Sequence, residues 1–506
     1  MELSKQSSLF KNGQPGFYAA LALLLALGIG FRLLNLTNPP LDFHAWRQLR
    51  SAVVARDMFY TWDRGADPTL RLKAQTLSGV ERLEPNLTEA AVALVYLVVG
   101  SEHLWISRIV TTLFWVIGGL ALFALARRMT SNDGALVALA YYLLLPFGNT
   151  VSRAFLPEPL MILWILLACY AAYRWSEAPS WAWAIATGIL SGLAVLTKVF
   201  AVFPLGFAIL FLLLASKKLG KLVSDPQTWV MGALAGLIPA LYYILPSPSA
   251  GGSYLTNWTL PYLHRLTDIW FYISWLNRLN TYFNLAVVLI GAAAILVLPK
   301  RARALCLGLW LGYIVTGAMV PSLILSHIYY NLPLVPILAL SLAPIGTLLL
   351  SNIGRQGRTW QILFLGTALV AIGYSVFLSR KEVTAQDFRS EPARWLALSQ
   401  KLPADSNIIG LTDDYNMRMR YYGWRFVQQY PQATDQDMAR LSGREFDETA
   451  ENWDYFTART EGYDFFIITL MDELDKQPYL KNILSNNYPI YDQGEGYIIF
   501  DLRQRK

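Results

Sequence analysis

The sequence predicts a polytopic α-helical membrane protein that ends in a small soluble α/β domain. Hydrophobic residues make up 55% of the 506 residues and charged residues only 15%, whereas soluble domains carry roughly 45–50% apolar and about 25% charged residues. Long apolar runs recur along the chain and stop near residue 383. Disulfide scaffolds are excluded, because Cys169 and Cys306, the two cysteines, both lie inside apolar runs.

A membrane-spanning helix needs about 20 mostly apolar residues, and about eleven runs approach that length. They lie near residues 16–36, 105–126, 134–149, 158–175, 180–197, 199–216, 228–246, 281–299, 304–322, 329–350 and 360–378. Lys and Arg clusters fall at alternate span ends, and the positive-inside rule then predicts a cytoplasmic N-terminus. The net charge of +7 is thereby explained by membrane orientation, and we expect no nucleic-acid partner.

Two segments between the predicted spans are expected on the outer side of the membrane. The first, residues 37–104, contains an amphipathic helix over 41–60 and a short apolar helix over 87–100 that would lie in the membrane interface. The second, residues 247–280, ends in a stretch rich in Trp and Tyr, which is typical of the aromatic belt at a membrane surface.

The last part of the chain, residues 384–506, has the composition of a soluble domain. Ser390 is placed to begin a helix that runs to Leu402. The pattern predicts buried strands over residues 407–411 and 463–470 and a hairpin over 489–502. We therefore predict a transmembrane domain over 1–383 and an outer α/β domain over 384–506.

The densest group of reactive side chains follows the first predicted span. Asp42, His44, Arg47 and Gln48 lie within seven residues, and on a helix the last three would share one face. Asp42 would precede that face, where the helix dipole favours a carboxylate. The alternative is a helix cap followed by an interfacial helix without chemistry.

Two more acids and one aromatic motif lie at predicted outer span ends. Glu84 precedes the interfacial helix, and Glu158 stands between two prolines at the start of the fourth span. His327 and Tyr330 open the tenth span. The alternatives are a helix-start carboxylate for Glu158 and membrane-belt residues for His327 and Tyr330.

Several cations remain at the same predicted face, among them Arg47, Arg50, Arg56, Arg108, Arg153 and Lys198. Arg108 and Lys198 stand at the ends of apolar runs, and Arg153 precedes Glu158. An ionisable group at membrane depth is a functional candidate, although a single one can also reach the headgroups by snorkelling. Together they indicate an anion site, because a phosphate near the membrane needs several cationic donors.

Taken in order, these motifs resemble the GT-C superfamily of integral-membrane glycosyltransferases. The resemblance covers residues 16–380, and it is nearest to glycosyltransferase family 39, which contains protein O-mannosyltransferases and lipid A aminoarabinose transferases. The residues that carry it are the Asp42 motif, Glu84 with its helix, Arg108 with the basic pair Arg127 and Arg128, Arg153 with Glu158, Lys198, and His327 to Tyr330.

The resemblance implies that a sugar is transferred from a polyprenyl-phosphate carrier to a glycan, lipid or protein acceptor at the outer face of a bacterial inner membrane. Asp42 would be the catalytic base, with Glu84 and Glu158 orienting the sugar or the acceptor. Lys198 and Arg153, supported by Arg108, His327 and Tyr330, would hold the lipid phosphate. His44, Arg47 and Gln48 would brace the loop or contact the acceptor.

Other functions stay open at this point. A transporter or flippase of an anionic lipid-linked substrate would use the same cations, although transporters usually carry charges near the bilayer midplane. A membrane sensor could bind a ligand in the outer domain through Asp413, Asp414, Arg418 and Trp424. The sequence requires no cofactor, and it leaves a divalent metal open, since His44 stands among acids.

Overall fold

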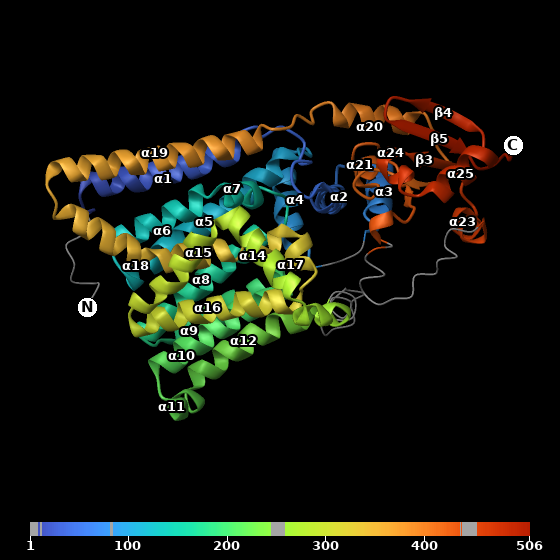
Figure 1. Ribbon diagram of the computed structural model, residues 1–506. Coiled ribbons are helices and arrows are strands. Elements are labelled where there is room, and N and C mark those ends of the chain that lie inside the picture. The colour runs from blue at the N-terminus through green and yellow to red at the C-terminus, as the bar shows by residue number, and fades with distance from the viewer. Residues whose placement is uncertain (1–8, 11–12, 81–83, 244–258, 436, 438–452) are drawn as a thin grey trace. The chain divides into compact units, whose positions relative to one another are not determined.

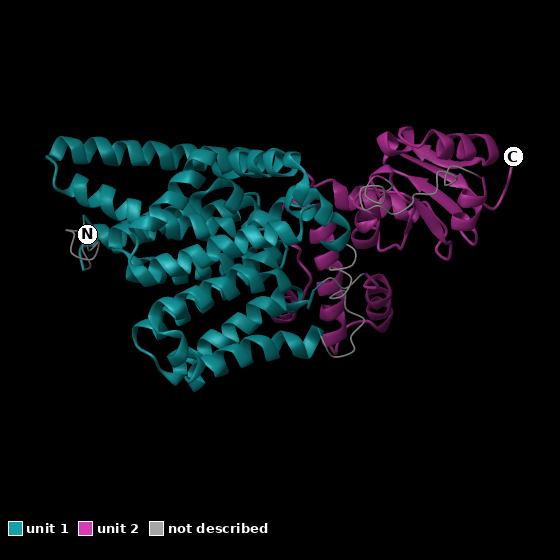
Figure 2. Cartoon of the chain, turned by 60° about the horizontal axis from the view of Figure 1, so that its bottom comes forward, with its two compact units in different colours: residues 1–36, 81–91, 105–386 teal, residues 37–80, 92–104, 387–506 magenta. Residues whose placement is uncertain are grey.

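The computed structural model describes residues 9–10, 13–80, 84–243, 259–435, 437 and 453–506. Contacts divide the chain into two compact units, coloured in Figure 2. Unit 1 comprises Met1–Leu36, Glu81–Ala91 and Trp105–Gln386, and unit 2 comprises Thr37–Val80, Val92–Leu104 and Asp387–Lys506. The domain boundary near residue 383 stays a prediction, and residues 247–258 of the second predicted outer loop lie outside the described residues.

Unit 1 is helical, as the apolar runs predict. Its longer helices are α1 (Pro15–Leu33), α5 (Trp105–Met129), α6 (Asn132–Leu144), α8 (Glu158–Glu177), α9 (Trp181–Thr197), α10 (Val202–Ser216), α12 (Pro226–Tyr243), α14 (Ile269–Phe283), α15 (Leu285–Ala294), α16 (Lys300–Met319), α18 (Leu334–Gly354) and α19 (Arg358–Val383). Short elements connect them: α7 (Pro146–Ser152), η2 (Val199–Ala201), α11 (Leu219–Val223), η4 (Leu260–Thr267), η5 (Ile295–Val297), α17 (Leu323–Ser326) and η6 (Ile328–Asn331).

The described residues contain seven helices that are long and apolar enough to cross a membrane, or nine spans if each of two bent helix pairs counts as one. The prediction of about eleven spans is therefore not confirmed by this measure. One difference is α9, an apolar helix of only 17 residues. These helices nevertheless make the chain an integral membrane protein.

The two bent pairs have local causes in the sequence. Pro146 follows α6 and lacks the N–H that would continue the helix, and the axis turns by 61° into α7. Asn284 adopts a left-handed φ of 63° between α14 and α15, where the bend is 91°. The run predicted as a span over 281–299 thus begins as a helix at Ile269, inside the segment predicted to be a loop.

Helices of unit 1 pack most extensively as the pairs α10–α16, α9–α12, α8–α9 and α6–α18. Helices α1 and α19 run side by side (Figure 1). Helices α16 and α10 approach each other closely where Gly308 and Gly312 face backbone atoms of Phe207 and Pro204. Small residues allow such close packing between membrane helices.

Replacing Gly312 with alanine is therefore expected to destabilise unit 1. A Cβ at this position would meet the backbone of Pro204, which cannot rotate away, and overpacking of this kind costs about 1–3 kcal/mol. Gly373→Ala in α19 is the matched control, because nothing lies within 4 Å of a Cβ there. Thermal unfolding in detergent should show a lower midpoint for Gly312→Ala alone; equal midpoints would contradict the close packing.

Unit 2 combines helices of the first predicted outer loop with an α/β sheet. The loop forms α2 (Ala45–Trp62) and α3 (Pro68–Leu77), and α4 (Leu87–Val99) crosses the boundary between the units. The C-terminal part contains the strands β1 (Ile408–Leu411), β2 (Gln428–Gln429), β3 (Phe465–Ile468), β4 (Ile490–Gly494) and β5 (Tyr497–Asp501) and the helices α20 (Glu391–Gln400), α21 (Met417–Tyr421), α23 (Trp453–Thr460), α24 (Met471–Asp475) and α25 (Pro478–Asn487). The predicted strands, hairpin and helices 41–60, 87–100 and 390–402 are confirmed, with shifts of a few residues.

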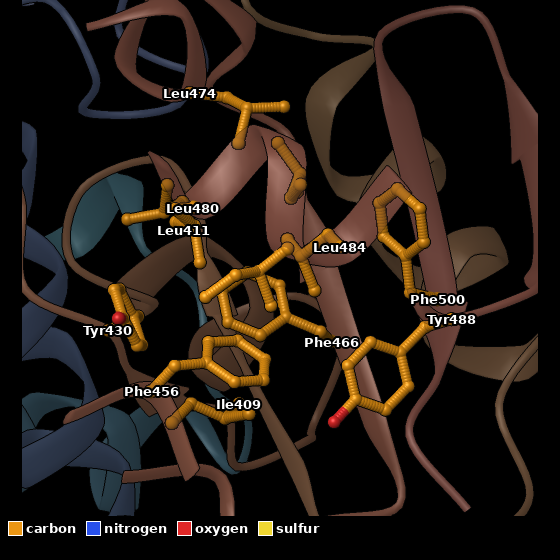
Figure 3. Close-up of a cluster of buried hydrophobic side chains, with 12 residues drawn as sticks. Ile409, Leu411, Tyr430, Phe456, Phe466, Leu474, Leu480, Leu484, Tyr488 and Phe500 are labelled. Atoms are coloured by element: carbon orange, nitrogen blue, oxygen red, sulfur yellow. The ribbon is translucent and has the colours of Figure 1, made fainter. Parts of the chain in front are cut away.

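The strands form one sheet in the order β2-β1-β3-β5-β4. Strands β2, β1 and β3 are parallel, and β5 and β4 form the antiparallel hairpin. Alternate residues of β1 and β3 enter two different cores, as the two-residue period of a strand requires. Ile409 and Phe466 belong to the cluster under α23 and α25 shown in Figure 3, whereas Ile408 and Phe465 pack with Trp395 of α20.

A buried arginine joins α2 to the C-terminal part of unit 2. The Nε of Arg56 lies 2.9 Å from a carboxylate oxygen of Glu102, and its Nη1 donates to the carbonyl of Tyr421 at 2.7 Å. The guanidinium carbon lies 3.9 Å from the ring centroid of Tyr421 and 4.0 Å from that of Trp424. Arginine stacks on aromatic faces while its N–H groups stay hydrogen-bonded, so one side chain connects three segments.

Arg56→Ala is expected to destabilise unit 2 by about 3–5 kcal/mol, because it leaves the Glu102 carboxylate, which is only 11% exposed, without its cation. Arg394→Ala is the control, since its pair with Glu391 is at 3.4 Å and its side chain is 46% exposed; exposed pairs contribute about 0–1 kcal/mol. Limited proteolysis of the full chain should release C-terminal fragments faster for Arg56→Ala. Equal rates for the two variants would contradict the joining role of Arg56.

Candidate active site

Lys198 lies at the centre of a buried charged group in unit 1. It ends α9 in an extended conformation, with φ −156° and ψ 120°, which separates α9 from η2. Its ammonium is paired with Glu158, the first residue of α8, and lies 3.7 Å from a carboxylate oxygen of Glu84. The three side chains are 3%, 1% and 6% exposed, so the charges are held almost entirely out of water.

Two aromatic faces complete the surroundings of this lysine. Its Nζ lies 4.9 Å from the ring centroid of Tyr329 and 4.3 Å from that of Tyr330, both in η6. The two tyrosine rings stack on each other at 5.1 Å, and the His327 ring lies 5.5 Å from Tyr329. A cation over an aromatic face is stabilised most when water is excluded.

Lys198 and Glu158 can still form hydrogen bonds to a ligand. An ammonium has three N–H donors, and within the described part of the chain Lys198 makes one hydrogen bond, to Glu158. The other carboxylate oxygen of Glu158, Oε2, is buried and has no hydrogen-bond partner among the described residues. The pair can therefore offer donors to an anion and an acceptor to a hydroxyl group.

A small cavity opens onto these two side chains. Its volume is about 20 Å³, and its lining includes Glu158, Lys198, Phe200, Tyr313, Tyr329 and Tyr330. A cavity of this size holds one water-sized group, so it fits a single oxygen substituent of a larger ligand.

Two of the predicted cations, Arg108 and Arg153, contact the backbone that follows α1. Arg108 Nη1 donates to the carbonyl of Asn35 at 3.0 Å, and Arg153 donates to Leu34 and Asn35 at 2.7 and 3.4 Å. Both arginines, 1% and 2% exposed, thus hold the backbone just after α1. Asn35 accepts from both Arg108 and Arg153, and Lys198 contacts Glu84, Glu158 and Tyr330.

The Asp42 motif belongs to unit 2. Helix α2 begins at Ala45, so His44 occupies the N-cap position with a left-handed φ of 44°. The predicted helical face shared by His44, Arg47 and Gln48 is therefore wrong for His44. Gln48 Nε2 donates to the carbonyl of Phe43 at 2.6 Å, which fixes the turn after the half-buried Asp42. The role of Asp42 as the base stays a prediction.

The pKa of His44 predicts a pH-dependent stability. Burial, together with the nearby Arg47, lowers the pKa of His44 to about 4 from 6.5. Between these values the unfolded chain binds a proton that the folded chain does not, so stability is full above pH 6.5 and falls as the pH drops towards 4. The maximum loss is about 3 kcal/mol. Asparagine tolerates a left-handed φ, so His44→Asn should fold and should flatten the dependence of thermal stability on pH between pH 7 and 4.5. His264→Asn, at an exposed site, is the control and should keep the dependence of the wild type. Parallel profiles for the two variants would contradict the lowered pKa of His44.

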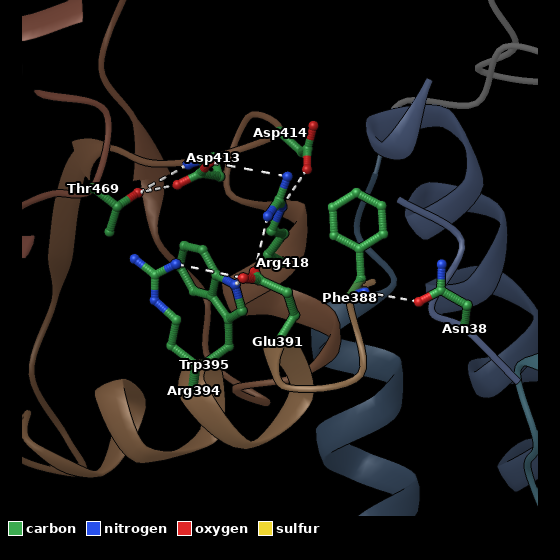
Figure 4. A network of polar contacts seen from close by, with 9 residues as sticks. All are labelled: Asn38, Phe388, Glu391, Arg394, Trp395, Asp413, Asp414, Arg418 and Thr469. Atoms are coloured by element: carbon green, nitrogen blue, oxygen red, sulfur yellow. Dashed lines mark hydrogen bonds and ion pairs between the residues drawn. The ribbon is translucent and has the colours of Figure 1, made fainter. Parts of the chain in front are cut away.

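Most of the C-terminal residues considered as a sensor site form ion pairs and hydrogen bonds with neighbouring side chains. Arg418 pairs with Asp414 and with Glu391, at 2.8 Å from the latter, and Thr469 donates to Asp413 at 2.6 Å (Figure 4). Trp424 packs instead against Arg56. Among the described residues, no group of three His, Cys, Asp or Glu side chains is arranged to hold a metal ion.

Sequence reasoning missed two residues of the site, Phe200 and Tyr313, and gave Tyr329 of the His327-to-Tyr330 motif no separate role. Tyr329 shares the lysine with Tyr330, and Phe200 and Tyr313 line the cavity. Tyr313 accepts from Trp275 at 3.1 Å and donates to Asn331 at 2.6 Å, so Trp275 is a buried residue of the bundle and not one of the membrane belt. A polar side chain within the apolar run 304–322 was the available signal for Tyr313.

One family model matches part of the chain. Residues 84–244 match the family model described as dolichyl-phosphate-mannose-protein mannosyltransferase. No curated protein matches the chain. The matched segment contains Glu84, Glu158, Lys198 and the two arginines.

Solved structures share the fold over nearly the whole chain. ArnT from Cupriavidus metallidurans bound to undecaprenyl phosphate is 14% identical, with a TM-score of 0.56 and coverage of 95% of this chain and 97% of that one. The oligosaccharyltransferase of Archaeoglobus fulgidus in the apo form is 13% identical, with a TM-score of 0.58 and coverage of 98% and 75%. The same archaeal enzyme in complex with an inhibitory peptide and a dolichol-phosphate is 14% identical, with a TM-score of 0.54 and coverage of 96% of this chain and 74% of that one. The resemblance to the GT-C glycosyltransferases is thereby confirmed at the level of the fold.

Proposed function

We propose that this protein is a glycosyltransferase that moves a sugar from a polyprenyl-phosphate-linked donor to an acceptor hydroxyl of a glycan, lipid or protein. The observation that carries the proposal is the buried Lys198, which retains N–H donors beside a cavity. The shared fold supports it, because related structures hold undecaprenyl phosphate and dolichol-phosphate. We place the reaction at the outer face of a bacterial inner membrane, with the N-terminus in the cytoplasm.

Lys198 would stabilise the departing lipid phosphate. When the bond between the anomeric carbon and the phosphate oxygen breaks, the electron pair stays on that oxygen and negative charge grows there. A fixed cation in a water-excluded site lowers the energy of this charge. Tyr329 and Tyr330 contact the ammonium through their ring faces and add no charge to it, so its charged neighbours are the carboxylates of Glu158 and Glu84.

The acceptor hydroxyl would attack the anomeric carbon from the opposite side, which inverts its configuration. The hydroxyl proton must pass to a base as the new C–O bond forms, and Asp42 is our candidate for that base. Glu158 would accept a hydrogen bond from a sugar hydroxyl through its unpartnered Oε2. Glu84 would share in positioning Lys198, from which it lies 3.7 Å away. Arg108 and Arg153 would act through the loop after α1 that they hold.

A lipid-linked-sugar profile tests the proposal directly. Cells that lack the gene should accumulate one polyprenyl-phospho-sugar, because its consumer is gone. Purified protein in proteoliposomes should then release polyprenyl phosphate from that donor only when an acceptor is present. Movement of the donor across the bilayer without its cleavage would instead identify a flippase and overturn the proposal.

A further inference from the structure

Unit 2 contains an open groove between α3 and the C-terminal sheet domain. Its volume is about 710 Å³, within the roughly 300–1,000 Å³ of small-molecule sites. Helix α3 contributes Leu72, Lys73 and Thr76, and the facing segments contribute Asn407, Trp424 and Phe426. None of these six residues takes part in the charged group around Lys198.

Two buried arginines hold the aromatic side chains of this groove. The guanidinium of Arg56 lies 4.0 Å from the ring centroid of Trp424, and that of Arg420 lies 4.7 Å from the ring of Phe426. The two arginines are only 4% and 5% exposed. The rings are therefore fixed before any ligand arrives, which lowers the entropy that binding must overcome.

The fixed aromatic surface nevertheless remains open to solvent. Phe426 is 43% exposed and Leu72 is 65% exposed. Trp424 adopts a left-handed φ of 49°, a conformation that costs energy for a non-glycine residue and tends to be retained at functional sites. Apolar side chains held outward beside a groove mark a binding surface.

The polar side chains of the groove suit a ligand that is rich in hydroxyl groups and carries negative charge. Thr76 and Asn407 place a short hydroxyl and a short amide on the lining; each donates one hydrogen bond to a backbone carbonyl, at 2.9 and 3.1 Å, and keeps its oxygen as an acceptor. Lys73 is exposed, and its Nζ lies 5.8 Å from the Trp424 ring centroid. The lining has two cations, Lys73 and Arg425, and one acid, Glu461, so it favours anions.

We propose that this groove binds an acidic oligosaccharide segment of the acceptor, an inference that rests on the proposed glycosyltransferase function. A pyranose ring presents a flat C–H face, which packs on an aromatic ring, and a rim of hydroxyl groups, which bond to short polar side chains. Lys73 would contact a carboxylate or phosphate substituent. Trp424 also contacts Arg56 of α2, so the groove is attached to the helix that follows the Asp42 motif.

Calorimetric titration of the full-length protein in detergent tests the groove with three probes: hexagalacturonate, the neutral maltohexaose and an acidic hexapeptide. Hexagalacturonate should bind best. Phe426→Ala should weaken it about tenfold, whereas Tyr491→Ala should not, although both side chains are 43% exposed. Lys73→Gln should reduce the affinity for hexagalacturonate to that for maltohexaose.

Three results would overturn the groove proposal: no saturable binding of hexagalacturonate, equal affinity in Phe426→Ala and Tyr491→Ala, or preference for the peptide. The test is independent of the donor site, because Lys198→Met should bind hexagalacturonate like the wild type. If the wild-type protein bound hexagalacturonate but neither bound polyprenyl phosphate nor transferred sugar, only the proposed function would be contradicted.

Discussion

Lys198→Met is expected to reduce sugar transfer by about 10²–10³-fold, the usual effect of removing one preorganised group that stabilises charge in the transition state. The same change should lower stability by about 3–5 kcal/mol, because Glu158 and Glu84 then remain buried without their cation. Single-turnover transfer from a polyprenyl-phospho-sugar and thermal unfolding measure the two effects separately.

A second substitution separates chemistry from folding at this site. Adding Glu158→Gln to Lys198→Met removes one unpaired charge and should recover part of the stability while transfer stays low. Lys217→Ala is the matched control, since its pair with Asp225 is at 2.6 Å but its side chain is 26% exposed. If the double variant regained transfer together with stability, Lys198 would have only a structural role.

Asp42→Asn is the second large effect that we expect. An amide cannot take up the acceptor proton, so transfer should fall by about 10²–10⁴-fold, while the affinity for polyprenyl phosphate and the amount of folded protein stay unchanged. Titration of polyprenyl phosphate and rapid-mixing transfer assays check both statements.

Asp63→Asn provides the comparison for Asp42→Asn. Asp63 is also half-buried and accepts a hydrogen bond from the backbone of Gly65 at 2.9 Å, which an amide oxygen can still accept. This variant should transfer sugar normally. Turnover in Asp42→Asn comparable to that of Asp63→Asn would remove Asp42 from the role of base and direct attention to Glu84 or Glu158.

The sequence by itself determined the fold class and most elements, because these depend on short-range patterns. Runs of apolar residues predicted the helices of unit 1, and strand-length runs predicted β1, β3 and the β4–β5 hairpin. The number of spans was harder to predict from the sequence, since the 91° bend at Asn284 depends on the left-handed φ of a single residue. Lys198 and Glu158 were also identifiable, as charges at the ends of apolar runs.

Only the tertiary structure decided which of these charges meet. Lys198 and Glu158 are 40 residues apart in the chain, and helix packing alone turns them into a pair with Glu84 alongside. Arg108 and Arg153, which the sequence grouped with Lys198, hold backbone carbonyls after α1. A sequence pattern reports that a charge is near a membrane face, but its partner is set by how helices distant in the chain pack, because burial forces each charge to find a counter-charge or a carbonyl.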